Sequence, residues 1–237
     1  MGKRGKTRRR GKGGKWSSLS FRYKGDTSYL SYKDVEKSKY FTAKVVDLIN
    51  DPGRTTPIMV LKHEKEYIKL PAPKKVSVGQ EIQFGVSAEV KEGNVIPLAR
   101  IPDGTLISNV ELTPNDGGKL IRSAGTQARV VLHEGEQVTI QLPSKKFKKI
   151  SSLCRATVGG LAGGGMKEKP FIKAGNKYKA KKARRKLYPV TSGSAMNAVD
   201  HKYGGAKANK PHSVSRNAPP GRKVGSIASK RTGRKKR

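Results

Sequence analysis

Few residues of this chain could do acid–base or metal chemistry: it has four histidines and one cysteine. The most suggestive pair is Asp200–His201, inside the stretch SGSAMNAVDHKYGG (Ser192–Gly205). Neighbours in sequence do not supply the spatial arrangement of a catalytic pair, and no carboxylate cluster surrounds this one. We therefore interpret His201 as a side chain ordered by hydrogen bonds or stacking, and not as an autonomous catalyst.

Metal and nucleotide sites are not indicated either. The candidate ligands lack the paired spacing of a zinc site: Cys154, His63, His133, His201 and His212. The stretch GGLAGGGMK (Gly159–Lys167) resembles a phosphate loop, but Glu168 stands where the pattern requires Ser or Thr. We interpret its glycines as sites where one backbone approaches another closely, and we predict neither a metal site nor a cofactor.

The charge of the chain restricts its partners. The net charge is +35, and a soluble protein this basic needs a polyanion nearby. Residues 1–15 hold eight Lys/Arg and no acid, and residues 166–237 hold 22 Lys/Arg and two acids. Residues 40–150 are nearly neutral, with 16 Lys/Arg and 12 Asp/Glu. Nucleic acid fits this pattern better than an anionic membrane surface, because the basic stretches lack hydrophobic residues at helical spacing.

Neither a membrane span nor a secretory leader is predicted. No run of about 18 apolar residues occurs. No apolar core follows the N-terminal sequence MGKRGKTRRRGKGGKW. The single cysteine, Cys154, allows no disulfide within the chain and indicates a cytosolic protein.

The nearly neutral middle of the chain is predicted to be all-β. We expect strands at Tyr40–Ile49, Glu81–Val90 and Thr105–Leu112, and hairpins turning at His63–Lys65 and His133–Glu136. About nine short strands separated by Gly/Pro turns are typical of small barrels or a sandwich. We favour two small barrels that meet near Pro97, where a Pro/Gly-rich join divides the strands about evenly.

The two ends are expected to be extended and disordered in isolation, apart from a short helix at Tyr178–Tyr188. Their cations can contact phosphates with little regard to sequence. The aromatic residues interleaved with these cations can stack on unpaired bases or pack on the barrels: Trp16, Phe21, Tyr23, Phe171, Tyr178, Tyr188 and Tyr203. Gly-rich arms suit folded RNA, whereas DNA is less favoured because no helix-turn-helix, zinc-finger or basic-zipper pattern occurs.

Long stretches of the chain resemble the universal large-subunit ribosomal protein of the L-two family, in its archaeal and eukaryotic branch. They are LPAPKKVSVGQEIQFGV, GNVIPLARIPDGTLISNVEL, GGKLIRSAGTQARVV, CRATVG, AMNAVDH and SRNAPPGRKVGSIASKRTGR, in order along nearly the whole chain. The resemblance implies an OB-fold followed by an SH3-like barrel, with long basic irregular extensions at both ends. The expected ranges are a basic N-terminal extension at 1–37, the OB-fold at 38–96, the SH3-like barrel at 97–170 and a basic C-terminal extension at 171–237.

The resemblance also implies a function and partners. The chain would be a non-enzymatic constituent of the cytoplasmic ribosome and a primary binder of large-subunit ribosomal RNA. It would support subunit association across the interface with the small subunit, transfer-RNA binding and the peptidyl-transferase region, beside neighbouring ribosomal proteins and away from membranes. Structural Mg²⁺ or K⁺ bridging to RNA are the only ions considered. The residues expected to contact RNA are Arg8, Arg9, Arg10, Lys15, Trp16, Lys167, Lys177, Lys179, Lys181, Lys182, Arg184, Arg185, Met196, Asn197, Asp200, His201, Lys202, Arg216, Arg222, Lys223, Lys230 and Arg231.

The stretch AMNAVDH resembles the family's extended loop, which reaches into ribosomal RNA towards the peptidyl-transferase region. Within it, Asn197 can hydrogen-bond base edges or 2′-hydroxyls, and Asp200 is expected to orient His201 or to cap local backbone. His201 matches the family's histidine, and our hypothesis is that it stabilises RNA packing. Two departures are visible: Ser192–Ser194 replaces the usual Arg-Gly-Val or Arg-Gly-Thr, and Lys202–Tyr203 follows His201 in place of Pro.

Two other classes of function compete with the structural role. One is an enzyme whose peptidyl-transferase activity is centred on His201. The other is a DNA-packaging protein, which the charge alone would also permit.

Overall fold

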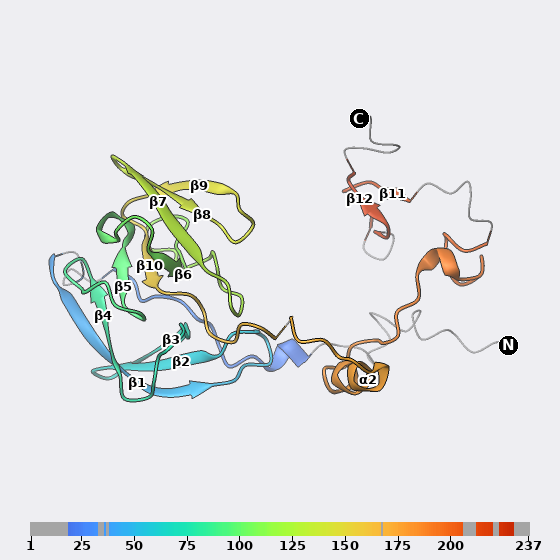
Figure 1. Cartoon of the computed structure of the whole chain (residues 1–237), viewed down its shortest axis with the longest axis horizontal. Helices are drawn as coiled ribbons and strands as arrows, with labels where there is room; N and C mark the ends of the chain where they lie inside the picture. Colours follow the sequence, from blue (N-terminus) through green and yellow to red (C-terminus); the bar gives the residue numbers. More distant parts are fainter. Residues whose placement is uncertain are drawn as a thin grey trace. The chain divides into compact units, whose positions relative to one another are not determined.

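The computed structural model describes residues 19–32, 36, 38–166, 168–205, 212–219 and 223–229. Contacts between residues divide the chain into two compact units. Residues 19–171 form one unit, here called the body, and residues 1–18 and 172–237 form the other, whose part from residue 172 onward is here called the tail. Figure 1 labels the strands of the body and the helix of the tail.

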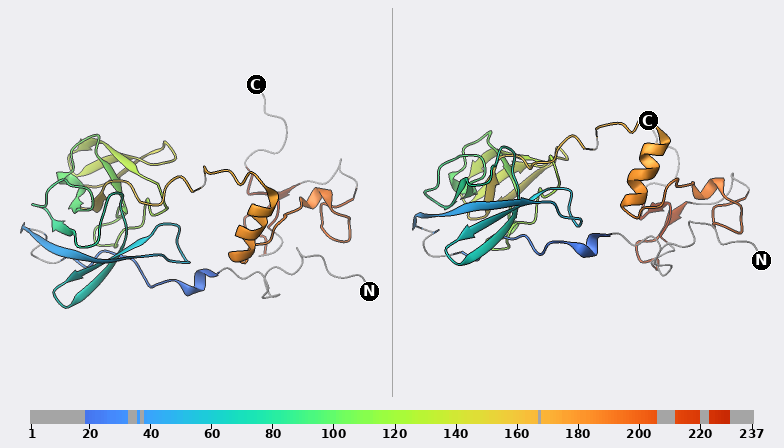
Figure 2. Two further views of the ribbon diagram at one scale, coloured as in Figure 1. Left: turned by 60° about the horizontal axis from the view of Figure 1, so that its bottom comes forward. Right: turned by 90° about the horizontal axis from the view of Figure 1, so that it is seen from below.

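The body is one continuous ten-stranded sheet. Its strands cross the sheet in the order β3-β2-β1-β4-β5-β10-β6-β7-β8-β9, and β4 and β5 pair in parallel while the other neighbours pair antiparallel. Figure 2 shows the blue and teal strands β1–β3 and the yellow-green strands β7–β9 on opposite sides of the body. The strand bounds are β1 (Tyr40–Ile49), β2 (Ile58–His63), β3 (Glu66–Pro71), β4 (Glu81–Gly85), β5 (Val95–Pro97), β6 (Leu106–Ser108), β7 (Ala128–Glu134), β8 (Gln137–Gln141), β9 (Phe147–Ser151) and β10 (Arg155–Val158).

Two separate hydrophobic cores lie along this sheet. One gathers buried side chains from residues 29–95 and has Phe84 stacked on Phe41, with ring centroids 4.9 Å apart. The other gathers buried side chains from residues 88–158, with Ile107 and Ile140 fully enclosed. The chain is therefore all-β, as predicted, and the two cores are consistent with an OB-fold followed by an SH3-like barrel. The domain boundaries expected at residues 38, 97 and 171 stay a prediction.

Strand β1 shows how the sequence directs side chains to the core. Its alternation sends Phe41, Ala43 and Val45 inward, as the two-residue period of a strand requires. The pairing of β1 with β2 then shifts between Val45 and Asp47, so that one extra residue is accommodated. Bulges of this kind bend a strand and increase its twist, which a short sheet needs in order to curl around a core.

A buried ion network ties three distant segments of the body together. The Arg155 guanidinium on β10 donates Nη2–H to Glu111 Oε1 and Nη1–H to Glu36 Oε2, both at 2.9 Å, and its side chain is 1% exposed. The Arg155 backbone N–H also donates to Glu111 Oε2 at 2.8 Å. Burial by itself would lower the pKa of Arg155, but the two carboxylates raise it above its usual value. The guanidinium lies over the rings of Tyr32 and Tyr29, at 4.0 and 5.2 Å from their centroids.

The segment before β1 contributes more to the body than the sequence indicated. Tyr29 is 4% exposed, and its hydroxyl donates to the Asn109 carbonyl at 2.7 Å and lies 2.7 Å from Thr157 Oγ1. Burial is the main cause that raises the pKa of Tyr29. Thr27 is also buried and accepts a hydrogen bond from Arg122. Thr27, Tyr29 and Glu36 lie in the segment that was expected to be a disordered arm, and they supply buried groups to the body.

The loop after β1 is held by a buried carboxylate. Asp51 accepts a hydrogen bond from the Gly53 N–H at 2.8 Å and forms an ion pair with Arg54. Burial would raise the pKa of Asp51, but these two partners outweigh it and hold the pKa below its usual value. The charged form of Asp51 therefore stabilises the folded loop.

Most of the predicted strands are present, and two of them are shorter than expected. The strand Tyr40–Ile49 and the hairpins that turn near His63–Lys65 and His133–Glu136 are confirmed. The strand expected at Glu81–Val90 ends at Gly85. This residue has a φ of +143°, a backbone conformation that glycine adopts readily and that residues with a side chain rarely adopt. The strand expected at Thr105–Leu112 ends at Ser108, because Asn109 adopts a left-handed conformation with φ +47°.

Candidate nucleic-acid interface

The tail concentrates positive charge, and the Lys and Arg side chains that the structure describes there are exposed or half-buried. Residues 172–237 contain 20 Lys/Arg and one acid, Asp200. Its helix α2 (Ala174–Ala183) has no buried residue and no acidic residue in its first turn. Because a helix turns about 100° per residue, Lys179 and Lys182 lie on one face of the helix, and Lys177 points to nearly the opposite side. A helix charged on several sides can approach phosphates on more than one side.

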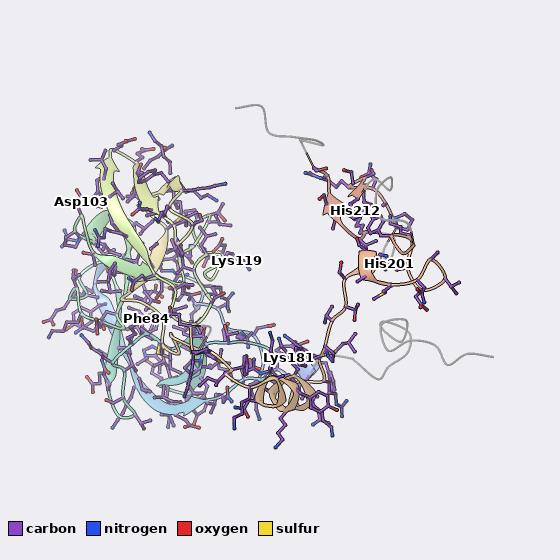
Figure 3. All side chains as sticks on the ribbon, turned by 45° about the vertical axis from the view of Figure 1, so that its right-hand side comes forward. Phe84, Asp103, Lys119, Lys181, His201 and His212 are labelled. Carbon is purple, nitrogen blue, oxygen red and sulfur yellow. The ribbon has the colours of Figure 1, made fainter. Side chains whose placement is uncertain are left out.

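The C-terminal end of α2 accommodates several basic residues. Lys181 and Lys182 lie in the last turn, where cations interact favourably with the helix dipole. Arg185 then takes a φ of +50°, and the Lys186 N–H donates to the Lys181 carbonyl at 2.8 Å. The Lys177 ammonium lies 5.4 Å from the Tyr188 ring centroid. The helix predicted at Tyr178–Tyr188 is therefore present but lies four to five residues earlier, and Figure 3 shows Lys181 extending from it.

A compact loop follows, and it contains the AMNAVDH stretch. The 3-10 helix η4 (Gly193–Ala195) opens it, and the Asp200 and His201 N–H groups donate to the Asn197 carbonyl at 3.0 and 3.2 Å. The Gly205 N–H donates to the Met196 carbonyl at 3.2 Å and closes the loop. The loop, defined here as residues 192–205, is thus folded by its own backbone hydrogen bonds.

Tyr203 anchors this loop to the segments that follow it. Its side chain is 7% exposed, and its hydroxyl donates to the Val224 carbonyl at 2.8 Å. Its ring stacks on His212, with centroids 4.2 Å apart, and tilts against His201 at 5.2 Å. Figure 3 labels His201 and His212, both of which lie in this part of the tail. Tyr203 is thus the core of a small structure within the tail, and does not pack on a barrel through these contacts.

Two short parallel strands complete this small structure. They are β11 (Ser213–Val214) and β12 (Ser226–Ile227), paired at Ser213 with Ser226 and at Val214 with Ile227. Gly225 has φ +88°, and a Cβ there would lie 2.2 Å from the His212 carbonyl oxygen. A side chain at this position would therefore separate the strand pair from Tyr203.

The glycines of the loop serve close approach more than bending. A Cβ on Gly193 would lie 2.3 Å from His201 Nδ1, and one on Gly204 would lie 2.1 Å from the Asn197 carbonyl oxygen. Only Gly205, with φ +83°, adopts the left-handed conformation that tight bends use. At Gly193 and Gly204 glycine is needed because a ring and a carbonyl occupy the space that a side chain would fill.

The predicted RNA-contacting residues that the structure describes are all at least partly exposed. Those on α2 and just after it are Lys177, Lys179, Lys181, Lys182, Arg184 and Arg185. Those on the loop and the strand pair are Met196, Asn197, Asp200, His201, Lys202, Arg216 and Lys223. The remaining ones lie outside the described residues: Arg8, Arg9, Arg10, Lys15, Trp16, Lys167, Arg222, Lys230 and Arg231.

The aromatic residues of the basic segments divide into two groups. Phe21, Tyr23, Phe171 and Tyr178 are between 45% and 62% exposed, and so are available for stacking on a base. Tyr188 and Tyr203 pack within the tail. Their interaction with RNA stays a prediction.

Two of the groups considered for chemistry, His133 and Cys154, lie in the body. His133 hydrogen-bonds Asp103 and the Leu98 carbonyl in the body, and Cys154 is buried there, which raises the pKa of its thiol to about 12. Among the residues that the structure describes, no three His, Cys, Asp or Glu side chains are grouped to hold a metal ion. Within the same residues, no helix is both long and apolar enough to span a bilayer.

Sequence reasoning missed some structural partners of the loop. It assigned no role to His212 as a stacking surface or to the Val224 carbonyl as an acceptor, although Tyr203 contacts both. It also expected Asp200 to orient His201 or to cap local backbone, and the hydrogen bond that the structure shows on the His201 ring comes instead from the Tyr203 N–H. A buried aromatic residue next to two glycines was the only signal available in sequence.

Comparison with known proteins agrees with this architecture. The family model described as "Ribosomal Proteins L2, C-terminal domain" matches residues 91–224. The large ribosomal subunit protein uL2 of Methanothermobacter thermautotrophicus is 48% identical over 241 residues, covering 100% of both chains. The uL2 proteins of Methanosphaera stadtmanae and Methanocaldococcus jannaschii are each 46% identical over the full length of both chains. The resemblance to the archaeal branch is thereby confirmed, and the chain belongs to the uL2 family of large ribosomal subunit proteins.

Proposed function

We propose that this chain is a structural constituent of the large ribosomal subunit in the cytoplasm, and that its tail binds large-subunit ribosomal RNA. The observation that carries the proposal is the positive charge of the tail, 20 Lys/Arg against one acid, in a member of this family. Such a concentration of cations binds a polyanion through release of its counterions. The body is a separately cored β unit from which the tail extends.

The finer roles form part of the same proposal. The loop of residues 192–205 would reach into ribosomal RNA near the peptidyl-transferase region and support transfer-RNA binding and the association of the two subunits. Its folded backbone and its exposed Asn197 and Lys202 support a role in packing RNA. The family favours a structural role over an enzymatic one.

The salt dependence of RNA binding tests the proposal. The measurement is the affinity of the full chain for large-subunit ribosomal RNA at several salt concentrations, with duplex DNA as competitor. One triple variant replaces α2 lysines with Gln: Lys179, Lys181 and Lys182. A matched triple variant replaces exposed lysines near the β8–β9 turn: Lys145, Lys146 and Lys148.

We expect the α2 variant to lower the steepness of the salt dependence by about 2–3 logarithmic units per tenfold change in salt, since each phosphate contact contributes about 0.7–0.9. The matched body variant should change it by less than about one unit. Equal slopes in the two variants would contradict tail-based binding. A preference for duplex DNA at matched salt would instead favour a DNA-packaging protein.

A further inference from the structure

The hydrogen bond on the His201 ring determines which ring nitrogen carries the proton. The backbone N–H of Tyr203 donates to His201 Nδ1 at 3.1 Å. A backbone N–H can only donate, so Nδ1 must present its lone pair and carry no proton. A neutral imidazole with a bare Nδ1 has its proton on Nε2.

The Nε2 side of the ring has no partner of its own within the tail segments that the structure describes. Of the hydrogen bonds made by described residues, only the one from Tyr203 reaches this ring. The ring also lies directly against Gly193, where any Cβ would overlap it. His201 is therefore fixed in orientation but retains one unused donor, and the side chain is partly exposed.

The fixed orientation depends on Tyr203, which is buried by contacts within the tail. Its hydroxyl is bonded to the Val224 carbonyl and its ring is stacked on His212, so residue 203 is held in place by these two segments. The Gly204 N–H also donates to the His201 carbonyl at 2.8 Å, which ties residue 201 to the same turn. The donor is thus positioned by contacts within the tail itself.

We propose that Tyr203 is a positioning residue that holds His201 as its Nε2–H tautomer, and that His201 presents this N–H to a hydrogen-bond acceptor of ribosomal RNA. The acceptor is an oxygen or ring nitrogen of a nucleotide, and the recognition is that of a neutral donor. A ring that already carries a proton on Nε2 does not accept one there, so this arrangement also opposes a general-base role for His201. The RNA-binding half of the inference rests on the proposed function above, whereas the tautomer does not.

The first test is a nitrogen NMR experiment on the free full-length chain with labelled histidine. The chain has four histidines, so the His201 signals can be assigned from their disappearance in His201→Gln. At a pH where the ring is neutral, we expect the pattern of the Nε2–H tautomer. The Tyr203→Phe variant keeps the backbone donor and the stacked ring, and it should keep that pattern. The Tyr203→Ala variant should give the averaged signals of a mixture.

An Nδ1–H pattern in the wild-type chain, or an unchanged pattern in Tyr203→Ala, would overturn the positioning role.

The second test compares two amides at position 201 in binding to large-subunit ribosomal RNA. His201→Gln can place an N–H near the position of Nε2, whereas His201→Asn can reach only the position of Nδ1. We expect His201→Asn to lose about 3–10-fold in affinity, the net value of one hydrogen bond, and His201→Gln to lose less.

Equal losses in the two amide variants would contradict donation by Nε2. The tautomer and the proposed function can fail independently of each other. If the wild-type chain shows the Nε2–H pattern but does not bind ribosomal RNA above its affinity for duplex DNA, the proposed function fails while the tautomer stands.

Discussion

Replacing Arg155 with Met should destabilise the body strongly. The side chain is 1% exposed and is bonded to the carboxylates of Glu36 and Glu111, both at 2.9 Å. Met fills much of the same volume but donates nothing, so two buried carboxylates lose their guanidinium partner. Breaking a buried ion pair in this way costs about 3–5 kcal/mol, a large part of the roughly 5–15 kcal/mol that a domain has. The lost contact with Tyr32, 4.0 Å from the guanidinium, adds to this cost.

The free energy of unfolding can be measured by urea denaturation of the full chain, followed by circular dichroism of the strands. Arg129→Met is the matched control, because Arg129 is an exposed arginine on β7 and its replacement should change stability by less than about 0.5 kcal/mol. Adding Glu111→Gln to Arg155→Met should recover part of the loss, since it removes one of the two charges. A loss below about 1 kcal/mol in Arg155→Met, or one equal to that of the control, would refute the reasoning.

Three further changes test other parts of the body. Asp51→Asn should lower the free energy of unfolding by about 1–2 kcal/mol at pH 7. Because the folded-state pKa of Asp51 lies below its usual value, the difference from wild type should shrink as the pH falls below about 4, as denaturation at several pH values would show. Gly118→Ala should lower the free energy of unfolding by more than about 2 kcal/mol, because a Cβ there would lie 2.6 Å from Asn109 Oδ1. Gly104→Ala has open space around it and should lower the free energy of unfolding by about 1 kcal/mol in the same measurement. The Cys154 thiol should resist iodoacetamide at pH 8 in the folded chain and react once urea unfolds it, since burial raises its pKa to about 12; rapid reaction in the folded chain would contradict this.

Local patterns predicted the hairpins of the body because the information lies within a few residues. The turn at His63–Lys65 separates two runs of β-branched and aromatic residues, and the pairing of His63 with Glu66 follows from the turn. The ends of β4 and β6 could not be predicted, since they depend on backbone conformations at Gly85 and Asn109 that the neighbouring elements impose.

Interactions between distant residues were beyond the sequence. Arg155 is 119 residues from Glu36, and nothing in either segment indicates the other. Tyr29 lies in a segment without apolar periodicity, so its place in a core could be known only once the strands around it were placed. The same limit applies to the tail. Its charge predicted a nucleic-acid partner, but the hydrogen bond from Tyr203 to Val224 could not be predicted because it joins residues 21 positions apart.

The position of β10 in the sheet has a consequence for the order in which the body is completed during synthesis. β10 is the last of the ten strands in the chain, yet it lies between β5 and β6. A nascent chain whose residues up to 151 have left the ribosome therefore has all the other strands, but the edges of β5 and β6 that β10 will pair with are still unpaired. The carboxylates of Glu36 and Glu111 also lack their partner, because Arg155 has not yet left the ribosome. The body can close only within the last few residues before the tail begins, so the most basic part of the chain leaves the ribosome behind a body that has just become able to fold.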